Sequence, residues 1–258
     1  MGVKKGGQVR IFFKTFSFST GVYSILLFSF GLGLSYRPVW AGSREEPAFC
    51  ELSEFLKTED PSFRDNPKLV RARGFRLGDV TLVGLSVGRS EVKEVIELAH
   101  SHDRLKDIAG KNYCTWYLHY PTPSLSYFLN SLYAMQKFNF APILRNPKDL
   151  SAAQAVAEVM SSLEGVFSGE NPSFLGCLTE NKFLAVGCQG MAHRGPTVFG
   201  AVLAFMGCSP QHSAEIVNAL WGLNGVAFEV RKAVLEAAYE LGNSLISKQK
   251  IGSSEMAK

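Results

Sequence analysis

An uncharged stretch of 22 residues lies near the start of the chain, at residues 15–36, directly after a basic segment. The basic side chains there are those of Lys4, Lys5, Arg10 and Lys14. A basic segment followed by an apolar one is the layout of a secretory signal peptide, and Ala41 before Gly42 offers signal peptidase a small residue. We therefore expect residues 1–41 to be a signal peptide. The alternative is an uncleaved anchor, because such a stretch could span ~30 Å of hydrocarbon.

Cleavage would remove five of the 27 basic residues and none of the 23 acidic ones. The 217 residues that remain would be almost neutral, so they would have no general attraction to nucleic acid or anionic lipid. We expect no nucleic-acid partner, and membrane contact only through the leader if it is retained. A chain of this length suits one core. We expect a single α/β domain at residues 75–250, after an irregular segment at 42–74 and before a frayed polar tail at 251–258.

Hydrophobic periodicity and turn residues predict strands interleaved with helices. Strands are predicted at 75–87 (a pair or one bent strand), 113–119, 138–144, 174–179 and 183–189, the last two joined in a tight hairpin at Glu180 and Asn181. Helices are predicted at 49–56, 90–101, 124–137, 151–163, 209–222 and 226–248. The apolar run 197–206 fits a buried strand and a short buried helix equally well. The pattern predicts an α/β or α+β fold with a single mixed layered domain.

Five cysteines follow the expected cleavage site, and export would place them where disulfides persist. They can form at most two intramolecular bridges, and burial is the commonest fate of the thiol left over. The bridging candidates are Cys177, Cys188 and Cys208. In the predicted hairpin, Cys177 and Cys188 would lie about 13 Å apart, which is beyond bonding distance. The pairs Cys188–Cys208 and Cys177–Cys208 both stay open.

A glycine-punctuated loop after the last predicted strand combines a thiol, an imidazole and a guanidinium. These belong to Cys188, His193 and Arg194, which are the candidate catalytic residues. A thiolate at Cys188 beside Arg194 or a protonated His193 could act as a nucleophile, in redox chemistry or as a soft-metal ligand. In the plainer alternative, Cys188 is buried or bridged and the other two side chains are solvated. The weaker candidates for a metal site are Cys188, His193, Cys208 and His212.

Three short motifs lie in the second half of the chain: Asn146-Pro147-Lys148-Asp149 before a helix, Ala185-Val186-Gly187-Cys188-Gln189-Gly190 before an apolar run, and Glu215-Ile216-Val217 in a later helix. Over residues 140–225 they resemble the C-terminal half of the uncharacterised ArCR family. Members of that family usually lack an export leader and often carry further cysteines. The resemblance implies an α/β fold and a role for Cys188 but indicates no reaction, and the cofactors are unknown.

The leading hypothesis is an exported, extracytoplasmic (periplasmic) binding or assembly protein that is not an enzyme, with a protein partner or a small-molecule ligand. It depends on the leader, the near-neutral charge and the lack of a phosphate-cradling or Gly-x-Ser-x-Gly motif. The alternative is a thiol-dependent redox, metal-binding or haem-binding protein centred on Cys188, His193 and Arg194. A hydrolase that uses Cys188 and His193 is a third hypothesis. The expected location is periplasmic or secreted, or the inner membrane if the leader is retained.

Overall fold

The computed structural model describes residues 45–255 except for 89, 112, 119–122, 135–138, 141–144, 165–176 and 223–224. The predicted signal peptide at 1–41 therefore lies outside the described residues. Within the described part of the chain, every helix is too short or too polar to cross a membrane.

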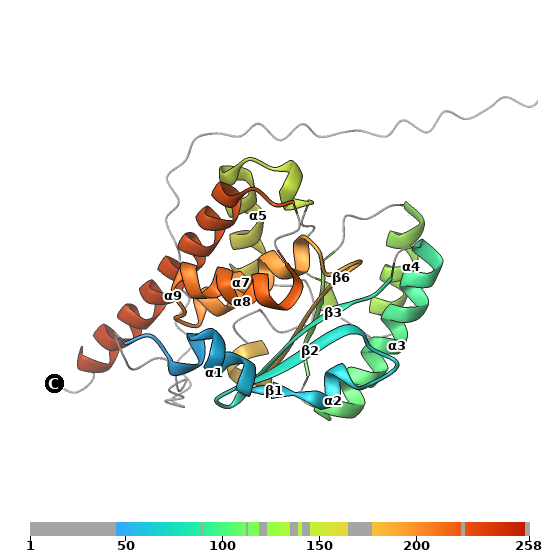
Figure 1. Cartoon of the computed structure of the whole chain (residues 1–258), viewed down its shortest axis with the longest axis horizontal. Coiled ribbons are helices and arrows are strands. Elements are labelled where there is room, and N and C mark those ends of the chain that lie inside the picture. Colours follow the sequence, from blue (N-terminus) through green and yellow to red (C-terminus); the bar gives the residue numbers. More distant parts are fainter. Residues whose placement is uncertain are drawn as a thin grey trace, which may run out of the picture. The chain divides into compact units, whose positions relative to one another are not determined.

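A six-stranded mixed sheet in the order β1-β2-β3-β6-β4-β5 lies at the centre of the described chain (Figure 1). Its strands are β1 (Glu59–Asp60), β2 (Val70–Leu77), β3 (Val80–Ser86), β4 (Thr115–Tyr117), β5 (Asn139–Phe140) and β6 (Phe183–Cys188). The first three strands pair antiparallel, whereas β3, β6, β4 and β5 run parallel. The last of these strands in the chain, β6, thus lies between β3 and β4.

Helices cover both faces of the sheet, which confirms the predicted α/β layered domain (Figure 1). One face carries α2 (Pro61–Arg64), α3 (Glu91–Ala109) and α4 (Pro123–Ala134). The other carries α1 (Leu52–Lys57), α5 (Ala152–Glu164), α7 (Arg194–Phe205), α8 (Pro210–Trp221) and α9 (Phe228–Glu255). Every residue of β6 is buried, as expected for a parallel strand with helices on both sides.

Several predicted elements are present. Residues 75–87 lie in a strand pair, with β2 and β3 antiparallel. The apolar run 197–206 is helical, because it belongs to α7, which is buried from Gly195 onward. Ser209 begins α8 as predicted, since its Oγ accepts a hydrogen bond from the backbone N–H of His212 at 3.2 Å.

The hairpin predicted at 174–179 and 183–189 is wrong. Cys177–Asn181 forms a π-helical turn, η3, and β6 pairs in parallel with β3 and β4. The side chains of β6 are buried on both faces, and a continuous apolar strand of this kind belongs in the centre of a parallel sheet. Lys182, whose φ is +53°, makes the turn into β6.

The segment 42–74 is more regular than predicted. It contains the 3₁₀ helix η1 (Ala48–Cys50), then α1, α2 and the edge strand β1. Its polar residues resemble loop residues in the sequence, but Glu59 in β1 accepts two hydrogen bonds from Arg73 in β2. At the other end, α9 continues to Glu255, into the predicted polar tail, because no proline follows Val226 to stop it.

Candidate functional site

Cys188 is the last residue of β6 and lies at the carboxyl edge of the parallel strands. Its backbone partner in β3 is Ser86, the last residue of that strand. On the other side, Tyr117 ends β4 opposite Gly187. Ligands of open α/β sheets bind in the crevice outside the carboxyl ends of the strands, at points where the strand order reverses. The insertion of β6 between β3 and β4 creates such a point at Cys188.

The helix that follows Cys188 points its N-terminus at the thiol. Residues 189–193 connect Cys188 to α7, which begins at Arg194. The backbone N–H of Gly195, in the first turn of α7, donates a hydrogen bond to Cys188 Sγ at 3.3 Å. A helix N-terminus carries a partial positive charge and favours an anion, whether a thiolate or a bound oxyanion.

Two backbone features let the helix approach this closely. A Cβ at Gly195 would lie 3.0 Å from Cys188 Sγ and 3.2 Å from Met191 Cε, so only glycine fits without displacing them. Met191 has a φ of +47°, which is unusual for a residue with a side chain, and it is buried. Backbone strain of this kind is found at functional sites, where the surroundings enforce it.

Carbonyl groups of the loop are held by neighbouring elements. The Gln189 carbonyl accepts hydrogen bonds from the N–H of Gly88 at 3.1 Å and the hydroxyl of Ser86 at 2.9 Å. The Gly190 carbonyl accepts one from Arg71 Nη1 at 3.3 Å. Because the C=O and N–H of a trans peptide point in opposite directions, the next two N–H groups along the chain point away from these anchors. Successive backbone N–H groups can form an anion-binding concavity.

Acidic groups lie beside the loop. Glu94, in the first turn of α3, is 1 % exposed and its carboxyl group is hydrogen-bonded by the Gln189 side chain. Burial raises the pKa of Glu94, and the neighbouring charge of Glu91 raises it further. Burial also raises the pKa of Tyr117, with added effects from the charges of Glu94 and Cys188, while Arg194 acts in the opposite direction. These groups therefore lie close enough to influence one another.

The other candidate of the loop, His193, faces elsewhere. Its Nε2 lies 3.9 Å from the position that a Cβ on Gly225 would occupy, between α8 and α9. Its carbonyl accepts hydrogen bonds from both the N–H and the hydroxyl of Thr197, at 3.1 and 2.7 Å, which fixes the start of α7. The structure thus brings Cys188 and Arg194 to one site with Glu94 and gives His193 a different neighbourhood.

Two disulfides use four of the five cysteines. Cys50 pairs with Cys208 and Cys114 with Cys177, at Cα–Cα distances of 5.2 and 5.7 Å, while Cys188 is free and buried. The two pairings left open by the sequence, Cys188–Cys208 and Cys177–Cys208, are therefore wrong. The reason is that β6 is a parallel strand, so the turn before it lies at the amino edge of the sheet, beside the residue that precedes β4.

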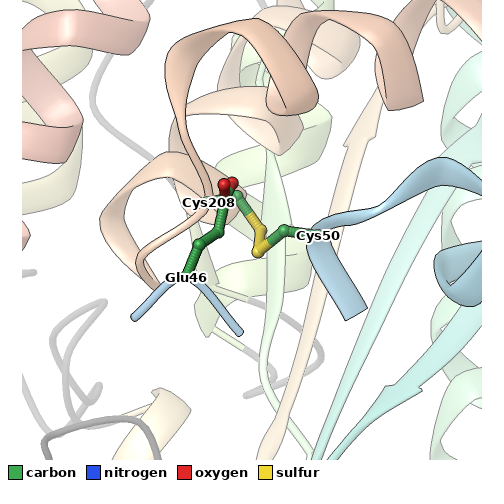
Figure 2. Close-up of side chains that lie close together, drawn as sticks. All are labelled: Glu46, Cys50 and Cys208. Carbon is green, nitrogen blue, oxygen red and sulfur yellow. A yellow bond between two sulfur atoms is a disulfide. The ribbon is translucent and has the colours of Figure 1, made fainter. Parts of the chain in front are cut away.

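The weaker metal candidates at the start of α8 have other partners. Figure 2 shows Glu46 next to the disulfide of Cys50 and Cys208. Among the residues that the structure describes, this is the one group of three potential metal ligands, and its two sulfur atoms are bonded to each other. His212 Nδ1 lies 2.9 Å from a carboxylate oxygen of Glu46. Cys208 is thus a cross-link rather than a thiolate ligand.

No family model matches the chain, and neither a curated protein nor a solved structure matches it. The resemblance of residues 140–225 to the ArCR family therefore stays a prediction.

The sequence identified the thiol and the guanidinium of this site but missed its other members. Glu94 resembles any acidic residue in the first turn of a solvated helix, and Tyr117 resembles a core aromatic in a strand. Neither has a local signal, because their proximity to Cys188 depends on the order of the strands. The available signal was the direct passage from a strand end through a glycine-containing loop to a helix start.

Proposed function

We propose that the protein is a thiol-dependent hydrolase of phosphate monoesters, with Cys188 as the nucleophile. The hydrogen bond from the α7 N-terminus, at Gly195, to Cys188 Sγ supports this most directly. The same N-terminus, the loop N–H groups and the Arg194 guanidinium would surround a tetrahedral oxyanion placed above the sulfur. Arginine forms bidentate hydrogen bonds with phosphate, and a helix N-terminus favours its negative charge.

Other thiol chemistries have less support in the described residues. Dithiol redox chemistry needs a second thiol near Cys188, and the other four cysteines are bonded in pairs. Acyl transfer by a cysteine and histidine pair needs the imidazole within hydrogen-bond reach of the thiol, whereas the His193 ring lies beside Gly225. Phosphoryl transfer needs mainly positioning and positive charge, which this site offers.

The reaction would proceed in two steps. The Cys188 thiolate attacks phosphorus, so that an S–P bond forms while the bond from phosphorus to the leaving oxygen breaks, and that oxygen takes a proton from a nearby acid. A water molecule then attacks phosphorus and gives its proton to the resulting carboxylate. The S–P bond breaks, which releases inorganic phosphate and restores the thiolate. One ester and one water are consumed, and no electrons are transferred.

Glu94 is the first candidate for the acid. Its buried carboxyl group contacts Gln189, the residue after the nucleophile, and its raised pKa favours the protonated form that must donate. Asp149 is a second candidate from the topology, because η2 (Pro147–Asp149) follows the parallel strand β5 as the loop of Cys188 follows β6.

The proposed location is periplasmic or extracellular, as the leader predicts. The two disulfides are compatible with an oxidising compartment. The non-enzymatic binding role and the thiol-dependent role predicted from the sequence differ in one respect that can be measured, namely whether Cys188 reacts.

The test is hydrolysis of para-nitrophenyl phosphate by the purified chain. We expect Cys188→Ser to reduce kcat by at least about 10³-fold, because the nucleophile is lost. Arg194→Lys should reduce it by about 10²-fold, since lysine cannot bind phosphate through a planar fork. Alkylation of Cys188 by iodoacetamide, located by mass spectrometry, should be slowed by orthovanadate.

Arg76→Lys serves as the matched control, because Arg76 in β2 pairs with Asp60 away from this loop. It should retain full activity. Hydrolysis that survives Cys188→Ser would refute the proposed mechanism. An inert Cys188, with no hydrolysis by the unmodified chain, would favour the non-enzymatic binding role.

A further inference from the structure

A pocket of about 460 Å³ opens beside the loop of Cys188. Three arginines from α2 and β2 line it, together with Met191 of the loop and Trp221 at the end of α8. Met191 follows Cys188 by three residues, and three peptide units span at most about 11 Å. The pocket and Cys188 thus share one short loop, and the volume of the pocket is typical of small-molecule sites.

Arg71 joins this pocket to the loop. A register shift between Val70 and Arg73 places a β-bulge in β2, and Arg71 within it has a φ of +50°. Bulges re-aim side chains, and here the guanidinium reaches the Gly190 carbonyl at 3.3 Å. A guanidinium has five N–H donors in a fork that matches phosphate. The bond to the Gly190 carbonyl uses only part of the donor capacity of Arg71.

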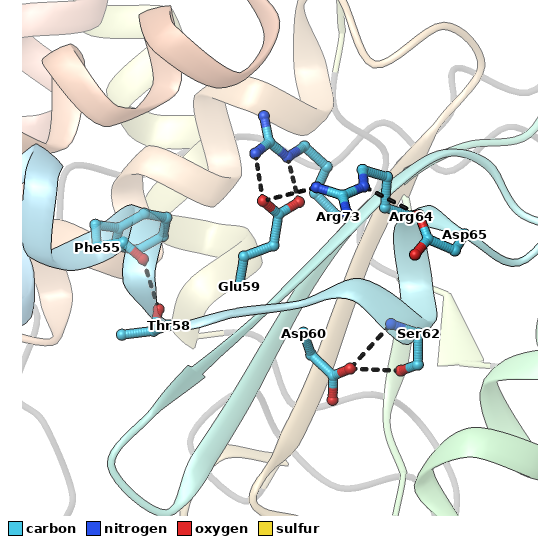
Figure 3. Close-up of polar contacts among 8 residues, drawn as sticks. All are labelled: Phe55, Thr58, Glu59, Asp60, Ser62, Arg64, Asp65 and Arg73. Atoms are coloured by element: carbon cyan, nitrogen blue, oxygen red, sulfur yellow. Dashed lines mark hydrogen bonds and ion pairs between the residues drawn. The ribbon is translucent and has the colours of Figure 1, made fainter.

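The other two arginines are held in place by carboxylates (Figure 3). Glu59 accepts hydrogen bonds from Arg73 at 2.9 and 2.7 Å and lies 3.5 Å from Arg64, which also contacts Asp65 at 3.1 Å. Three guanidiniums thus face two carboxylates, which leaves net positive charge at the pocket. Because they are already fixed, less conformational entropy is lost when an anion binds.

We propose that this pocket binds a second phosphate group of the substrate, with Arg71 as a specificity-determining residue. The inference rests on the proposed hydrolysis at Cys188. One phosphate would lie at the N-terminus of α7 while another contacts Arg71. The substrate class is then a small polyol or sugar that carries two or more phosphates. A concave pocket next to the reacting thiol suits a compact molecule of this kind.

The experiment compares two substrates, phenyl phosphate and inositol hexakisphosphate, by their kcat/KM. The unmodified protein should prefer inositol hexakisphosphate. Arg71→Gln should lower kcat/KM for inositol hexakisphosphate by about 10-fold to 100-fold more than it lowers kcat/KM for phenyl phosphate, the effect of one charge-assisted hydrogen bond. Arg71→Gly removes the guanidinium and also suits the positive φ, so it should fold and show the same change.

The matched control is Arg76→Gln, on the same strand but outside the pocket, and it should leave the preference unchanged. Equal loss for both substrates in the Arg71 variants would mean that Arg71 only supports the loop, and would overturn the inference. The inference also fails if phenyl phosphate is hydrolysed but inositol hexakisphosphate is not preferred, or if a phosphotyrosine peptide is preferred to it. Absence of phenyl phosphate hydrolysis by the unmodified protein would instead refute the proposed function.

Discussion

Cys177 and Cys188 lie at opposite ends of β6, and their chemical states differ. Cys177 precedes the strand, at the amino edge of the parallel sheet, and is bonded to Cys114. Cys188 ends the strand, at the carboxyl edge, and remains a thiol next to a helix N-terminus. The comparison teaches that the chemical state of each cysteine follows from the end of the strand at which it lies. Helices that follow parallel strands present their N-termini at the carboxyl edge, so a thiol there meets positive partial charge.

Of the changes at the two ends of β6, removal of the amino-edge disulfide is expected to have the larger effect on stability. Cys114 and Cys177 are separated by 63 residues, and the chain-entropy relation gives about 4 kcal/mol for a loop of that size. The variant that combines Cys114→Ala and Cys177→Ala should therefore lose about 4 kcal/mol of unfolding free energy in urea titrations. At low temperature it should keep the proposed phosphatase activity. If the variant also lost most of its activity at that temperature, the disulfide at the amino edge would be coupled to the site at the carboxyl edge.

Substitution at the carboxyl edge should have the opposite pattern. In Gly195→Ala the new methyl group would be placed against Cys188 Sγ and Met191, so activity should fall by far more than stability, which we expect to drop by about 2 kcal/mol. Gly190→Ala is the matched control, because a Cβ there meets nothing within 4 Å. Activity assays and thermal melting of both variants check this. Full activity of Gly195→Ala would contradict the assigned role of the α7 N-terminus.

Glu94 provides a test of the electrostatics at the carboxyl edge. Burial and then the charge of Glu91 raise its pKa above the ordinary 4.5. The stability it contributes is present below pH 4.5 and is lost as the pH rises through the folded pKa, so Glu94→Gln should be more stable than the unmodified protein at neutral pH. If Glu94 is the acid, this variant also loses the alkaline limb of the kcat–pH profile. Loss of that limb in Asp149→Asn instead would assign the proton to Asp149.

The smallest effect is expected beside the second disulfide. The hydrogen bond with Glu46 raises the pKa of His212 above 6.5, although burial lowers it. Burial raises the pKa of Glu46, but hydrogen bonds from Ser209 and His212 lower it below 4.5 overall. The pair thus stabilises the fold between about pH 4.5 and 6.5, and the part from His212 is lost as pH rises through its folded pKa. His212→Gln should be destabilised in that window and not at alkaline pH, as urea titrations at several pH values can measure.

The sequence predicted the fold class and most helices because those depend on local patterns. Ser209 followed by proline, and the apolar spacing of α5, are local signals of this kind. It failed at β6, where a buried parallel strand has no alternation to distinguish it from half of a hairpin. The two disulfides depend on strand order in the same way, so the pairing of Cys177 was beyond local reasoning.

The residues of the site likewise divide into those that the local sequence predicts and those that depend on strand order. Cys188 and Arg194 are joined by one loop, so their proximity could be inferred from the chain itself. Glu94, Tyr117 and Arg71 come from three other elements and meet the loop only because β6 is inserted between β3 and β4. Glu94 and Arg71 have ordinary sequence contexts. The bulge that directs Arg71 contains no glycine, so the sequence gives no sign of a bulge there.

The position of β6 also determines when the protein can fold. Thr81 pairs with Phe183, so the central strand leaves the ribosome long after the strand that it must join. Until then β3 and β4 each present an unpaired edge, and exposed edges recruit strands from other molecules. Pairing across such long separations is also slow. A nascent chain therefore remains vulnerable to aggregation until β6 is available to pair, and no fragment that stops before Phe183 can complete the sheet.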